Sequence, residues 1–340
     1  MKKRHINIPI FITHMGCPNM CVFCNQRTIS GHASFDPDEL DAEIERVLST
    51  AGADSEREIA FFGGSFTGID RNLMVELLTR AQGYIDKGAA GSIRLSTRPD
   101  YINDEILEIL GRYSVKTVEL GLQSLDDSVL EATKRGHDRE CALRACRDVV
   151  GAGFDLVGQM MIGLPLSDSE NERETARLIC EVGARGARVY PTVVFRGTEL
   201  SEMTANGIYT PISNEEAVVR TKDVLDIFDR AGVQCIRVGL CASENLSDES
   251  EVVGGANHSA IGEMAMGELY FDRICSEIER LGYRGGELKI YVSRGSVSKA
   301  SGQNRRNKTR FCEKYGFKSV KVLEKNEIIG YNIILEHYLR

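Results

Sequence analysis

The feature that most restricts the fold is a regular alternation of short apolar runs and longer amphipathic stretches, from Ile8 to about Gly232. The apolar runs that we read as strands are 8–13, 58–62, 92–96, 117–122, 154–162 and 187–195. Helical periodicity marks the stretches between them, including 38–50, 73–87, 104–112, 139–152 and 169–183. This alternation is typical of βα units around a parallel sheet. Six units are too few for a closed eight-stranded barrel, so we predict an α/β fold with a partial (β/α)6 barrel.

The pattern changes after a helical stretch at 214–231. We expect one more strand at 233–240, a long helix at 258–282, and antiparallel strands at 288–294 and 319–335, the last folding back at Lys325-Asn326. A chain of 340 residues is long enough for one large domain and one small one. We therefore predict a barrel domain at 1–232 and a small α+β module at 233–340.

Charge is distributed unevenly along the chain. The whole chain carries a net charge of −8, yet the segment 286–325 holds eleven Lys or Arg against three Glu, a local charge of +8. Four of these cations stand within six residues: Arg305, Arg306, Lys308 and Arg310. A solvated helix face would usually interleave acidic residues, whereas phosphate contacts require concentrated positive charge. We favour a polyanionic partner for this segment, RNA above all.

The composition is that of an ordinary globular protein, with 42% apolar and 27% charged residues. No apolar run approaches the roughly 18 residues of a membrane helix. The start is basic and then apolar, but no small-residue cleavage site precedes Cys17, so we read a first strand rather than a signal peptide. Ten cysteines without such a signal favour a reducing compartment. We predict a cytoplasmic protein with no membrane partner.

Three cysteines follow the first predicted strand in CPNMCVFC, at Cys17, Cys21 and Cys24. Thiolates are the usual ligands of iron–sulfur clusters, and a 4Fe–4S cube normally takes four of them. Three ligands leave one iron open to a substrate or cofactor. The alternatives are a redox pair, buried structural thiols, or a zinc knuckle completed by His14. The C-x3-C-x2-C spacing resembles that of radical SAM enzymes, which implies that S-adenosylmethionine chelates the open iron.

The other seven cysteines are scattered and form no further CxxC pair: Cys141, Cys146, Cys180, Cys235, Cys241, Cys275 and Cys312. A free cysteine often behaves as a small buried hydrophobic residue. We therefore expect most of the seven in the core, and no second cluster.

Polar motifs follow the predicted strands in order. After the second strand, FFGGSFTG supplies Gly63, Gly64 and Ser65, either as a plain turn or as backbone that a ligand can approach closely. The third and fourth strands close with Ser96, Thr97, Arg98, Gln123 and Ser124. Such groups can bind a ribose or a carboxylate, although solvated strand ends are polar as well. Because sites in such barrels form where the strands end, we expect these motifs to share one site with the cysteine loop.

Three further residues have both a functional and a structural interpretation. His137 in KRGHD titrates near neutrality when unperturbed, so it could carry a proton or simply serve as a hydrogen-bonded loop residue. Tyr190 and Arg196 bracket YPTVVFRGT, where a buried tyrosine and a surface arginine are the plainer interpretation. We assign no catalytic residue.

Five segments together resemble one family. EIAFFGGSFTG, STRPDYI, VELGLQSLDDSVLEATKRGH, AGFDLVGQMMIGLP and YPTVVFRGTELSEMTANGIYTPIS match, in order and spacing, the radical SAM core of the catalytic subunit of Elongator, which modifies wobble uridines in tRNA. The resemblance covers 58–213. Its TRPD and YPTxVxRGT motifs are specific, whereas GGS, GLQS and GLP are shared more widely, for example with oxygen-independent coproporphyrinogen oxidase. Elongator's longer RNA-binding segment, wider cysteine spacing and acetyltransferase-like domain have no counterpart in this chain, so the resemblance does not extend to acetyl-coenzyme A.

The resemblance implies residue roles. Gly63, Gly64 and Ser65 would contact the methionine part of S-adenosylmethionine, Gln123 and Arg135 would approach its polar groups, and Gln159 would lie near the ribose or the substrate. With the strand-end residues added, the predicted cofactor-binding set is Gly63, Gly64, Ser65, Ser96, Arg98, Gln123, Arg135 and Gln159. The predicted metal ligands are Cys17, Cys21 and Cys24.

Three functional hypotheses follow. The first is a radical SAM enzyme with a 4Fe–4S cluster and S-adenosylmethionine, acting on RNA, above all tRNA, and reduced by a donor such as flavodoxin or ferredoxin. The second keeps this chemistry but takes a small anionic metabolite such as a porphyrinogen. The third is a non-catalytic adaptor whose cysteine loop holds zinc or an inert cluster. Anaerobic reconstitution with iron and sulfide separates the third from the others.

Overall fold

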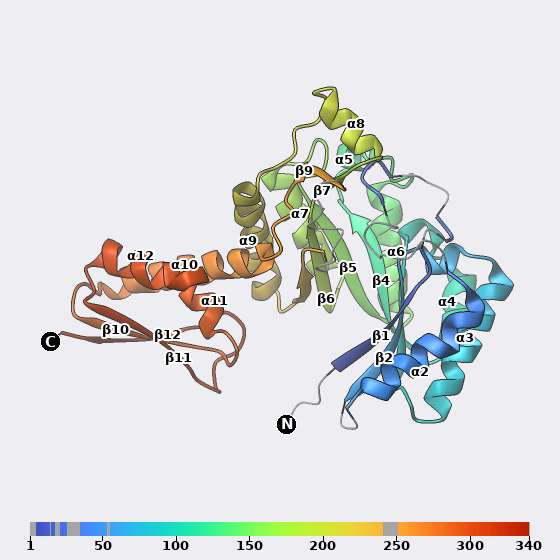
Figure 1. The fold of residues 1–340 in the computed structure, drawn as a ribbon, viewed down its shortest axis with the longest axis horizontal. Helices are drawn as coiled ribbons and strands as arrows, with labels where there is room; N and C mark the ends of the chain where they lie inside the picture. Colours follow the sequence, from blue (N-terminus) through green and yellow to red (C-terminus); the bar gives the residue numbers. More distant parts are fainter. Residues whose placement is uncertain are drawn as a thin grey trace.

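The computed structural model describes residues 5–13, 15–17, 21–25, 35–52, 55–240 and 251–339. Its larger part is a curled sheet of seven parallel strands in the order β1-β2-β3-β4-β5-β6-β8 (Figure 1). The strands are β1 (His5–Phe11), β2 (Glu56–Phe62), β3 (Ser92–Thr97), β4 (Val115–Gln123), β5 (Asp155–Ile162), β6 (Gly186–Pro191) and β8 (Gln234–Val238). The prediction of a partial parallel barrel is confirmed, and β8 adds a seventh strand to the six predicted units.

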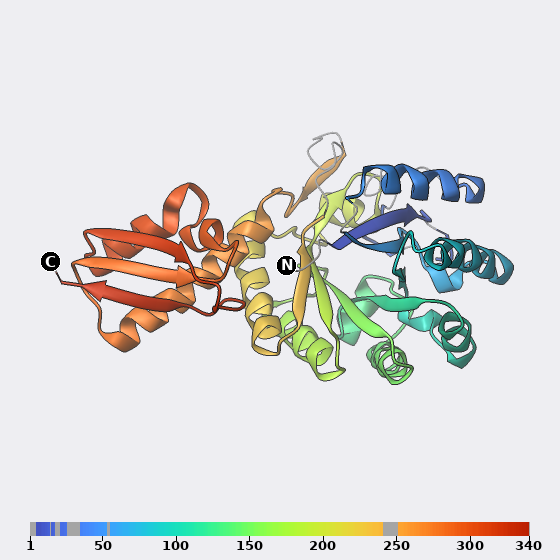
Figure 2. The same cartoon turned by 90° about the horizontal axis from the view of Figure 1, so that it is seen from below.

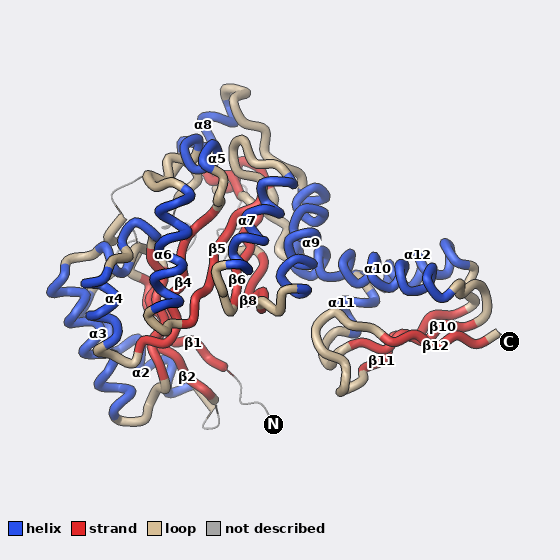
Figure 3. Tube along the Cα trace, turned by 180° about the vertical axis from the view of Figure 1, so that it is seen from behind, coloured by secondary structure: helices blue, strands red, loops and turns tan. Residues whose placement is uncertain are grey.

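Helices connect the strands and lie on the outer face of the curl (Figures 2 and 3). They are α2 (Leu40–Thr50), α3 (Arg71–Asp86), α4 (Asp104–Gly111), α5 (Asp127–Ala132), α6 (Arg139–Gly151), α7 (Ser169–Glu181), α8 (Glu199–Ala205) and α9 (Asn214–Arg230). Many begin after a polar residue that caps the first turn. Asp138, for example, accepts a hydrogen bond from the backbone N–H of Cys141 at 2.8 Å. A cap of this kind contributes about 1 kcal/mol and fixes where the helix starts.

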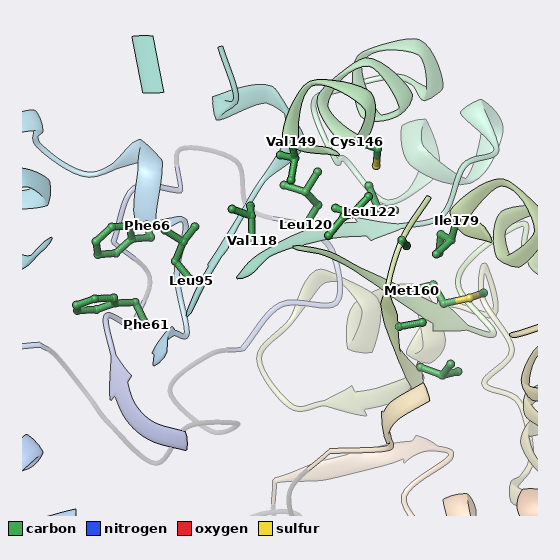
Figure 4. Close-up of a cluster of buried hydrophobic side chains, with 14 of the residues drawn as sticks. Phe61, Phe66, Leu95, Val118, Leu120, Leu122, Cys146, Val149, Met160 and Ile179 are labelled. Atoms are coloured by element: carbon green, nitrogen blue, oxygen red, sulfur yellow. The ribbon is translucent and has the colours of Figure 1, made fainter. Parts of the chain in front are cut away.

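The main core lies between the outer face of the sheet and these helices. Phe61 of β2, Leu95 of β3 and Leu120 of β4 are fully buried there, and the rings of Phe61 and Phe66 stack with centroids 4.4 Å apart (Figure 4). Because successive strand residues point to opposite faces, the alternate residues face the inside of the curl. Those inward residues include many polar ones, and they form part of the candidate site.

The stretch 187–195, predicted as a single strand, forms two. β6 ends at Pro191, and β7 (Val193–Phe195) leaves the parallel sheet to pair antiparallel with β9 (Val252–Gly255). The Thr192 hydroxyl donates a hydrogen bond to the Ile162 carbonyl at 2.7 Å, which anchors the bend. Gly255 has a φ of +88°, and a Cβ there would lie 2.4 Å from the Thr192 carbonyl oxygen. The close approach at this bend therefore requires glycine.

The C-terminal part forms a second layer structure, here called the tail module. α10 (Ile261–Leu281) leads into it from the barrel, and its sheet has the strand order β11-β10-β12 (Figure 1). Its remaining elements are β10 (Glu287–Val292), α11 (Val297–Ser301), a short 3-10 turn (Gln303–Arg305), α12 (Arg306–Tyr315), β11 (Ser319–Glu324) and β12 (Ile334–Tyr338). The predicted antiparallel arrangement is wrong for β10 and β11, which are parallel. α11 and α12 supply the crossover that a parallel pair needs.

The expected fold-back at Lys325-Asn326 does not make a hairpin, because β11 and β12 lie on opposite sides of β10. The predicted domain boundary after residue 232 falls between α9 and β8 and stays a prediction. Of the helices within the described ranges, none has the length and apolar character needed to cross a membrane.

Candidate cluster and cofactor site

The predicted site residues lie where the parallel strands of the barrel end. Cys17 follows β1, Gly63 follows β2, Arg98 follows β3, and Gln123 is the last residue of β4. β1 to β4 are consecutive parallel neighbours in the sheet, so these positions share one edge. Active sites of barrels with this architecture form at that edge.

The glycine turn after β2 packs against the segment that leads into the cysteine loop. The backbone N–H of Ser65 donates to the Met15 carbonyl at 2.9 Å. A Cβ on Gly64 would lie 2.5 Å from the Ile12 carbonyl oxygen, and one on Gly16 would lie 2.2 Å from that of Ser65. Gly16 and Gly64 are therefore required for a close contact between two backbone segments. That Gly63 and Gly64 also contact a cofactor stays a prediction.

The hydroxyl of Ser65 is used within the protein. Ser65 is 1% exposed, its Oγ lies 3.0 Å from Thr97 Oγ1, and it accepts a hydrogen bond from the Arg98 backbone N–H at 3.2 Å. This side chain connects the ends of β2 and β3. Ser65 therefore positions the site through these hydrogen bonds.

Two buried arginines face the thiol of Cys21. Arg135 Nη1 donates to Cys21 Sγ at 3.2 Å, and Arg98 Nη1 lies 4.0 Å from the same sulfur. Asp100 fixes the Arg98 guanidinium through two hydrogen bonds of 2.9 Å. The guanidinium of Arg98 thus has a carboxylate partner within the chain, and its predicted contact with the cofactor stays a prediction. Two guanidinium groups thus stand beside the sulfur of one predicted cluster ligand.

Cys17 also influences the pKa of Arg98. Burial alone would lower the pKa of Arg98, but the hydrogen bonds and charge of Asp100, followed by the charges of Cys17 and Cys21, raise this pKa above its ordinary value. Two of the three predicted ligands therefore lie within electrostatic reach of one buried cation. Arg98 would compensate negative charge on either sulfur.

Two of the predicted cofactor-binding residues each carry a buried polar atom that makes no hydrogen bond within the described part of the chain: Gln123 Oε1 and Arg135 Nε. Gln123 also has a φ of +66°, beside the irregularity between Gly121 and Gln123 where β4 pairs with β5. A buried polar group without a partner costs about 1–3 kcal/mol, and strained backbone gathers at binding sites. Both atoms fit the predicted contacts with polar groups of a cofactor.

The structure also brings Ser96 and Gln159 together, inside the curl. The Gln159 amide nitrogen donates to Ser96 Oγ at 3.3 Å and to Glu119 Oε2 at 2.8 Å. Both amide hydrogens are then engaged, so the Gln159 carbonyl oxygen is left as an acceptor. Glu119 orients this side chain, and sequence reasoning did not single it out.

Glu119 belongs to a set of paired charges that we call the polar layer, consisting of Glu58, Arg94, Glu119 and Arg188. Arg94 bridges Glu58 at 2.6 Å and Glu119 at 2.7 Å, and Arg188 binds Glu119 at 2.8 and 3.0 Å. Glu119 is fully buried. Burial raises the pKa of Glu119, but Arg188 and Arg94 outweigh burial and hold it below its ordinary value. The sequence signal was a charged residue at alternate positions of otherwise apolar strands.

The remaining candidates have different surroundings. Burial and the nearby Arg135 lower the pKa of His137 to about 4, so its ring is neutral near pH 7. Tyr190 lies on β6 beside Arg188, and burial raises its pKa. Arg196 is exposed just after β7, at the two-stranded ribbon that β7 forms with β9. None of the three gains a catalytic assignment from these positions.

The cysteines outside the loop are largely core residues, as expected. Cys146 and Cys275 are buried, and Cys180 and Cys235 are partly buried against apolar side chains. Burial raises the pKa of Cys146 to about 12 and that of Cys180 to about 11, which keeps both as thiols. Cys241 lies outside the described residues. Cys21, by contrast, has two cations beside its sulfur.

The arrangement of the three loop thiols stays a prediction. Around the loop, residues 14, 18–20 and 26–34 lie outside the description. Among the described residues, no group of three His, Cys, Asp or Glu side chains is arranged to hold a metal ion. Within the described part of the chain none of the three cysteines forms a disulfide, and Cys21 is flanked by cations. The chemistry of the donors, together with the two unpartnered polar atoms, fits an anionic thiolate-bound cluster and a polar cofactor.

Comparisons with known proteins agree with this site. The model of the radical SAM superfamily matches residues 11–179, and that of the radical SAM C-terminal domain matches 184–270. A tRNA uridine(34) acetyltransferase from Methanocaldococcus jannaschii is 27% identical over 54% of this chain and 38% of its own length. Elongator complex protein 3 from Saccharomyces cerevisiae is 26% identical over 57% of this chain and 42% of its own length. This chain therefore spans less than half of those two relatives.

Among solved structures, the Elp3 protein of Methanocaldococcus infernus, with its first 46 residues deleted, has a TM-score of 0.62 and 20% identity. The match covers 84% of this chain and 65% of that one, and it shows the fold. The two matching family models, the Elongator-like relatives and the curled parallel sheet lead to one conclusion. The chain is an enzyme that belongs to the radical SAM superfamily, with a 4Fe–4S cluster and S-adenosylmethionine as its cofactors.

Proposed function

We propose that this enzyme cleaves S-adenosylmethionine reductively and modifies RNA, with tRNA as the substrate. The observation that carries the chemical part is the Cys21 thiol, held between Arg98 and Arg135 at the edge where the strands end. The RNA part is supported by the tRNA-modifying relatives and by the basic tail module.

Cys17, Cys21 and Cys24 would hold the cluster, leaving one iron for S-adenosylmethionine. A bound, reduced cluster would supply the electron that cleaves S-adenosylmethionine to methionine and a 5′-deoxyadenosyl radical. Arg135 and Gln123 would bind polar groups of the cofactor through Arg135 Nε and Gln123 Oε1. We propose a separate reducing protein, such as flavodoxin or ferredoxin, as the source of the electron.

Gln159 and Ser96 would contact the ribose or the substrate from inside the curl. Glu119 holds the Gln159 amide nitrogen, so the carbonyl oxygen is free to accept a hydrogen bond from a hydroxyl or an N–H group. The polar layer fixes this orientation, because Glu119 is itself held by Arg94 and Arg188.

The basic segment contributes fewer free cations than its sequence suggests. Arg310 is bound to Glu268 at 2.7 and 2.9 Å and its guanidinium lies 3.4 Å from the centre of the Phe271 ring. Arg305 and Arg306 are exposed, and neither forms an ion pair with another described residue. We propose that these two residues contact RNA phosphates.

The experiment that tests this function is mass spectrometry of nucleosides from bulk tRNA, with and without the gene. Loss of one modified nucleoside, restored by the wild-type gene and not by a Cys21→Ser version, is the expected result. An unchanged tRNA profile, with turnover of a small anionic metabolite by the purified enzyme, would favour the metabolite hypothesis.

The tail has its own test. Arg305→Gln with Arg306→Gln should weaken tRNA binding and reduce its salt dependence by roughly two counterions. Lys116→Gln, an exposed lysine at the start of β4, is the matched control and should leave binding unchanged.

A further inference from the structure

One face of the tail-module sheet is uncovered. α10 and α12 pack on the other face, where Leu288, Ile290 and Val292 of β10 form a core with Phe271 and Phe311. Figure 2 looks onto the uncovered face, with the helices behind the sheet. No described residue outside the module covers it.

This open face consists of alternate residues of three strands: Glu287, Lys289 and Tyr291 of β10, Ser319, Lys321 and Leu323 of β11, and Ile334, Glu336 and Tyr338 of β12. The pairing register aligns Tyr291 with Leu323 on one side and with Ile334 on the other. Leu323 is 40% exposed and Ile334 is 41% exposed. An aromatic ring flanked by two exposed aliphatic side chains therefore crosses the sheet.

The tyrosines of this face are fixed by their hydroxyl groups. Tyr291 donates to Glu336 Oε2 at 3.0 Å, and Tyr338 donates to the same oxygen at 2.7 Å. Both rings are thus oriented before any ligand arrives, which reduces the entropy lost on binding.

Lysines accompany the two rings. The Lys289 ammonium lies 4.6 Å from the centre of the Tyr338 ring, and that of Lys325 lies 6.0 Å from the centre of the Tyr291 ring. Lys321 is the direct neighbour of Lys289 across the sheet. Positive charge beside aromatic rings is the combination that binds single-stranded nucleic acid, since bases stack on the rings and phosphates meet the ammonium groups.

We propose that the open face of the tail module binds single-stranded RNA, with a base stacked on Tyr291 and the backbone contacted by Lys289 and Lys321. The inference rests on the proposed function in taking RNA as the ligand. It adds a second contact surface, because Arg305 and Arg306 stand at the start of α12, in the layer on the other side of the sheet.

Unpaired RNA fits this face better than a duplex does. The bases of a duplex are stacked on each other and offer no free ring surface, whereas unpaired bases can lie on an aromatic platform. A second copy of the chain fits less well. Symmetric packing of two open faces would bring the lysine pairs of both copies together in a desolvated interface.

The test uses the full-length reconstituted enzyme and a fluorescent oligouridylate of about ten nucleotides, with a duplex of equal length as the second probe. Tyr291→Ala should weaken oligouridylate binding by between about 5-fold and about 150-fold, the range for loss of one stacking ring. Tyr291→Phe keeps the ring and should bind nearly as the wild type does. Lys321→Gln should reduce the salt dependence by roughly 0.7 of a counterion, and Lys116→Gln should leave it unchanged.

Three results would overturn the inference. One is Tyr291→Ala binding oligouridylate as tightly as the wild type does. Another is a wild-type enzyme that binds the duplex equally well through the same residue. The third is a Tyr291→Ala variant that changes self-association in the ultracentrifuge but leaves RNA binding unchanged. Thermal unfolding of each variant verifies that the tail module is intact.

S-adenosylmethionine cleavage without RNA, measured on the same preparations, tests the proposed function separately. If the enzyme cleaves S-adenosylmethionine and Tyr291→Ala binds oligouridylate as the wild type does, the proposed function stands and the RNA-binding face is refuted. If the enzyme binds oligouridylate through Tyr291 but never cleaves S-adenosylmethionine, the RNA-binding face stands and the proposed function is refuted.

Discussion

Charged side chains lie both inside the barrel and on the open face of the tail module, but they are paired in the first place and exposed in the second. Inside the barrel, Glu119 is fully buried and three side chains hold it: Arg94, Arg188 and Gln159. On the tail sheet, Lys321 is exposed and its neighbours are a second lysine and solvent. Buried charges must be paired because desolvation is costly, whereas exposed charges remain available to a partner. Burial, more than residue type, separates the paired structural charges of this molecule from the charges that we propose for RNA binding.

The same contrast occurs within the basic segment. Arg310 and Arg305 are five positions apart, yet Arg310 is bound to Glu268 and stacked on Phe271 while Arg305 is exposed. The sequence alone could not separate them, because the partners of Arg310 come from α10, about forty residues away in the chain.

The largest effect is expected from removing a sulfur at the barrel edge. Cys21→Ser should abolish iron loading, since the remaining loop thiols cannot hold the cluster, and S-adenosylmethionine cleavage should fall below detection. Iron analysis and the visible spectrum after anaerobic reconstitution measure this. Cys141→Ser, at a partly buried thiol on α6, is the matched control. Full iron loading of Cys21→Ser would show that this thiol is not a ligand.

The polar layer should dominate stability. Glu119→Gln removes the buried counter-charge of Arg188 and leaves Arg94 paired with Glu58 alone. It should lower the free energy of unfolding by about 3–5 kcal/mol. Lys321→Gln on the open face should change it by less than about 0.5 kcal/mol. Urea denaturation compares the two. Equal losses in the free energy of unfolding would show that the buried and the exposed charges contribute alike to stability.

The Glu119 contribution should also depend on pH. The folded pKa of Glu119 lies below its ordinary value of 4.5, so the stabilisation is present above that pH and is lost as the pH falls through the folded value. The difference between wild type and Glu119→Gln should therefore shrink in acid. A difference that grows below pH 4.5 would contradict the pairing.

Arg310 and Arg305 should separate stability from binding. Arg310→Ala removes the two hydrogen bonds to the Glu268 carboxylate and the contact with the Phe271 ring. It should destabilise the enzyme by about 1–2 kcal/mol. Arg305→Ala should leave stability unchanged and weaken tRNA binding. Thermal unfolding and tRNA binding should be measured on both variants. If Arg305→Ala were the less stable of the two, the assignment of Arg310 to stability and Arg305 to binding would be wrong.

An effect that is absent near pH 7 and develops only in acid is expected at His137. Its folded pKa of about 4 lies below the ordinary 6.5, so the unfolded chain takes up a proton first as the pH falls. Stability should therefore decline between pH 6.5 and pH 4, and His137→Gln should lack this part of the decline. An NMR titration of the ring gives the midpoint directly, and a value near 6.5 would show an exposed, unperturbed histidine.

Much of the fold followed from the sequence, because each βα unit carries its own local signals. Asp138 marks the start of α6, and alternating apolar residues mark the strands. The break at Thr192 and the parallel pairing of β10 with β11 did not follow, because both depend on contacts between segments distant in the chain. Gly255, about sixty residues on, permits the first, and the α11–α12 crossover imposes the second.

The candidate site divides in the same way. The loop cysteines, Gln123 and Arg135 stood in recognisable motifs after strands. Glu119, Arg94 and Arg188 carried only a weak signal, since one charged residue in an apolar strand does not reveal which strand supplies its partner. Likewise, nothing in the sequence showed that the Arg98 guanidinium would donate a hydrogen bond to the Asp100 carboxylate.

The cluster and its cofactor are tested most directly by anaerobic reconstitution of the wild-type enzyme with iron and sulfide, followed by reduction in the presence of S-adenosylmethionine. We expect a brown protein with about four irons per chain that releases methionine and 5′-deoxyadenosine. A colourless protein that retains zinc in the cysteine loop and leaves S-adenosylmethionine intact would contradict this expectation.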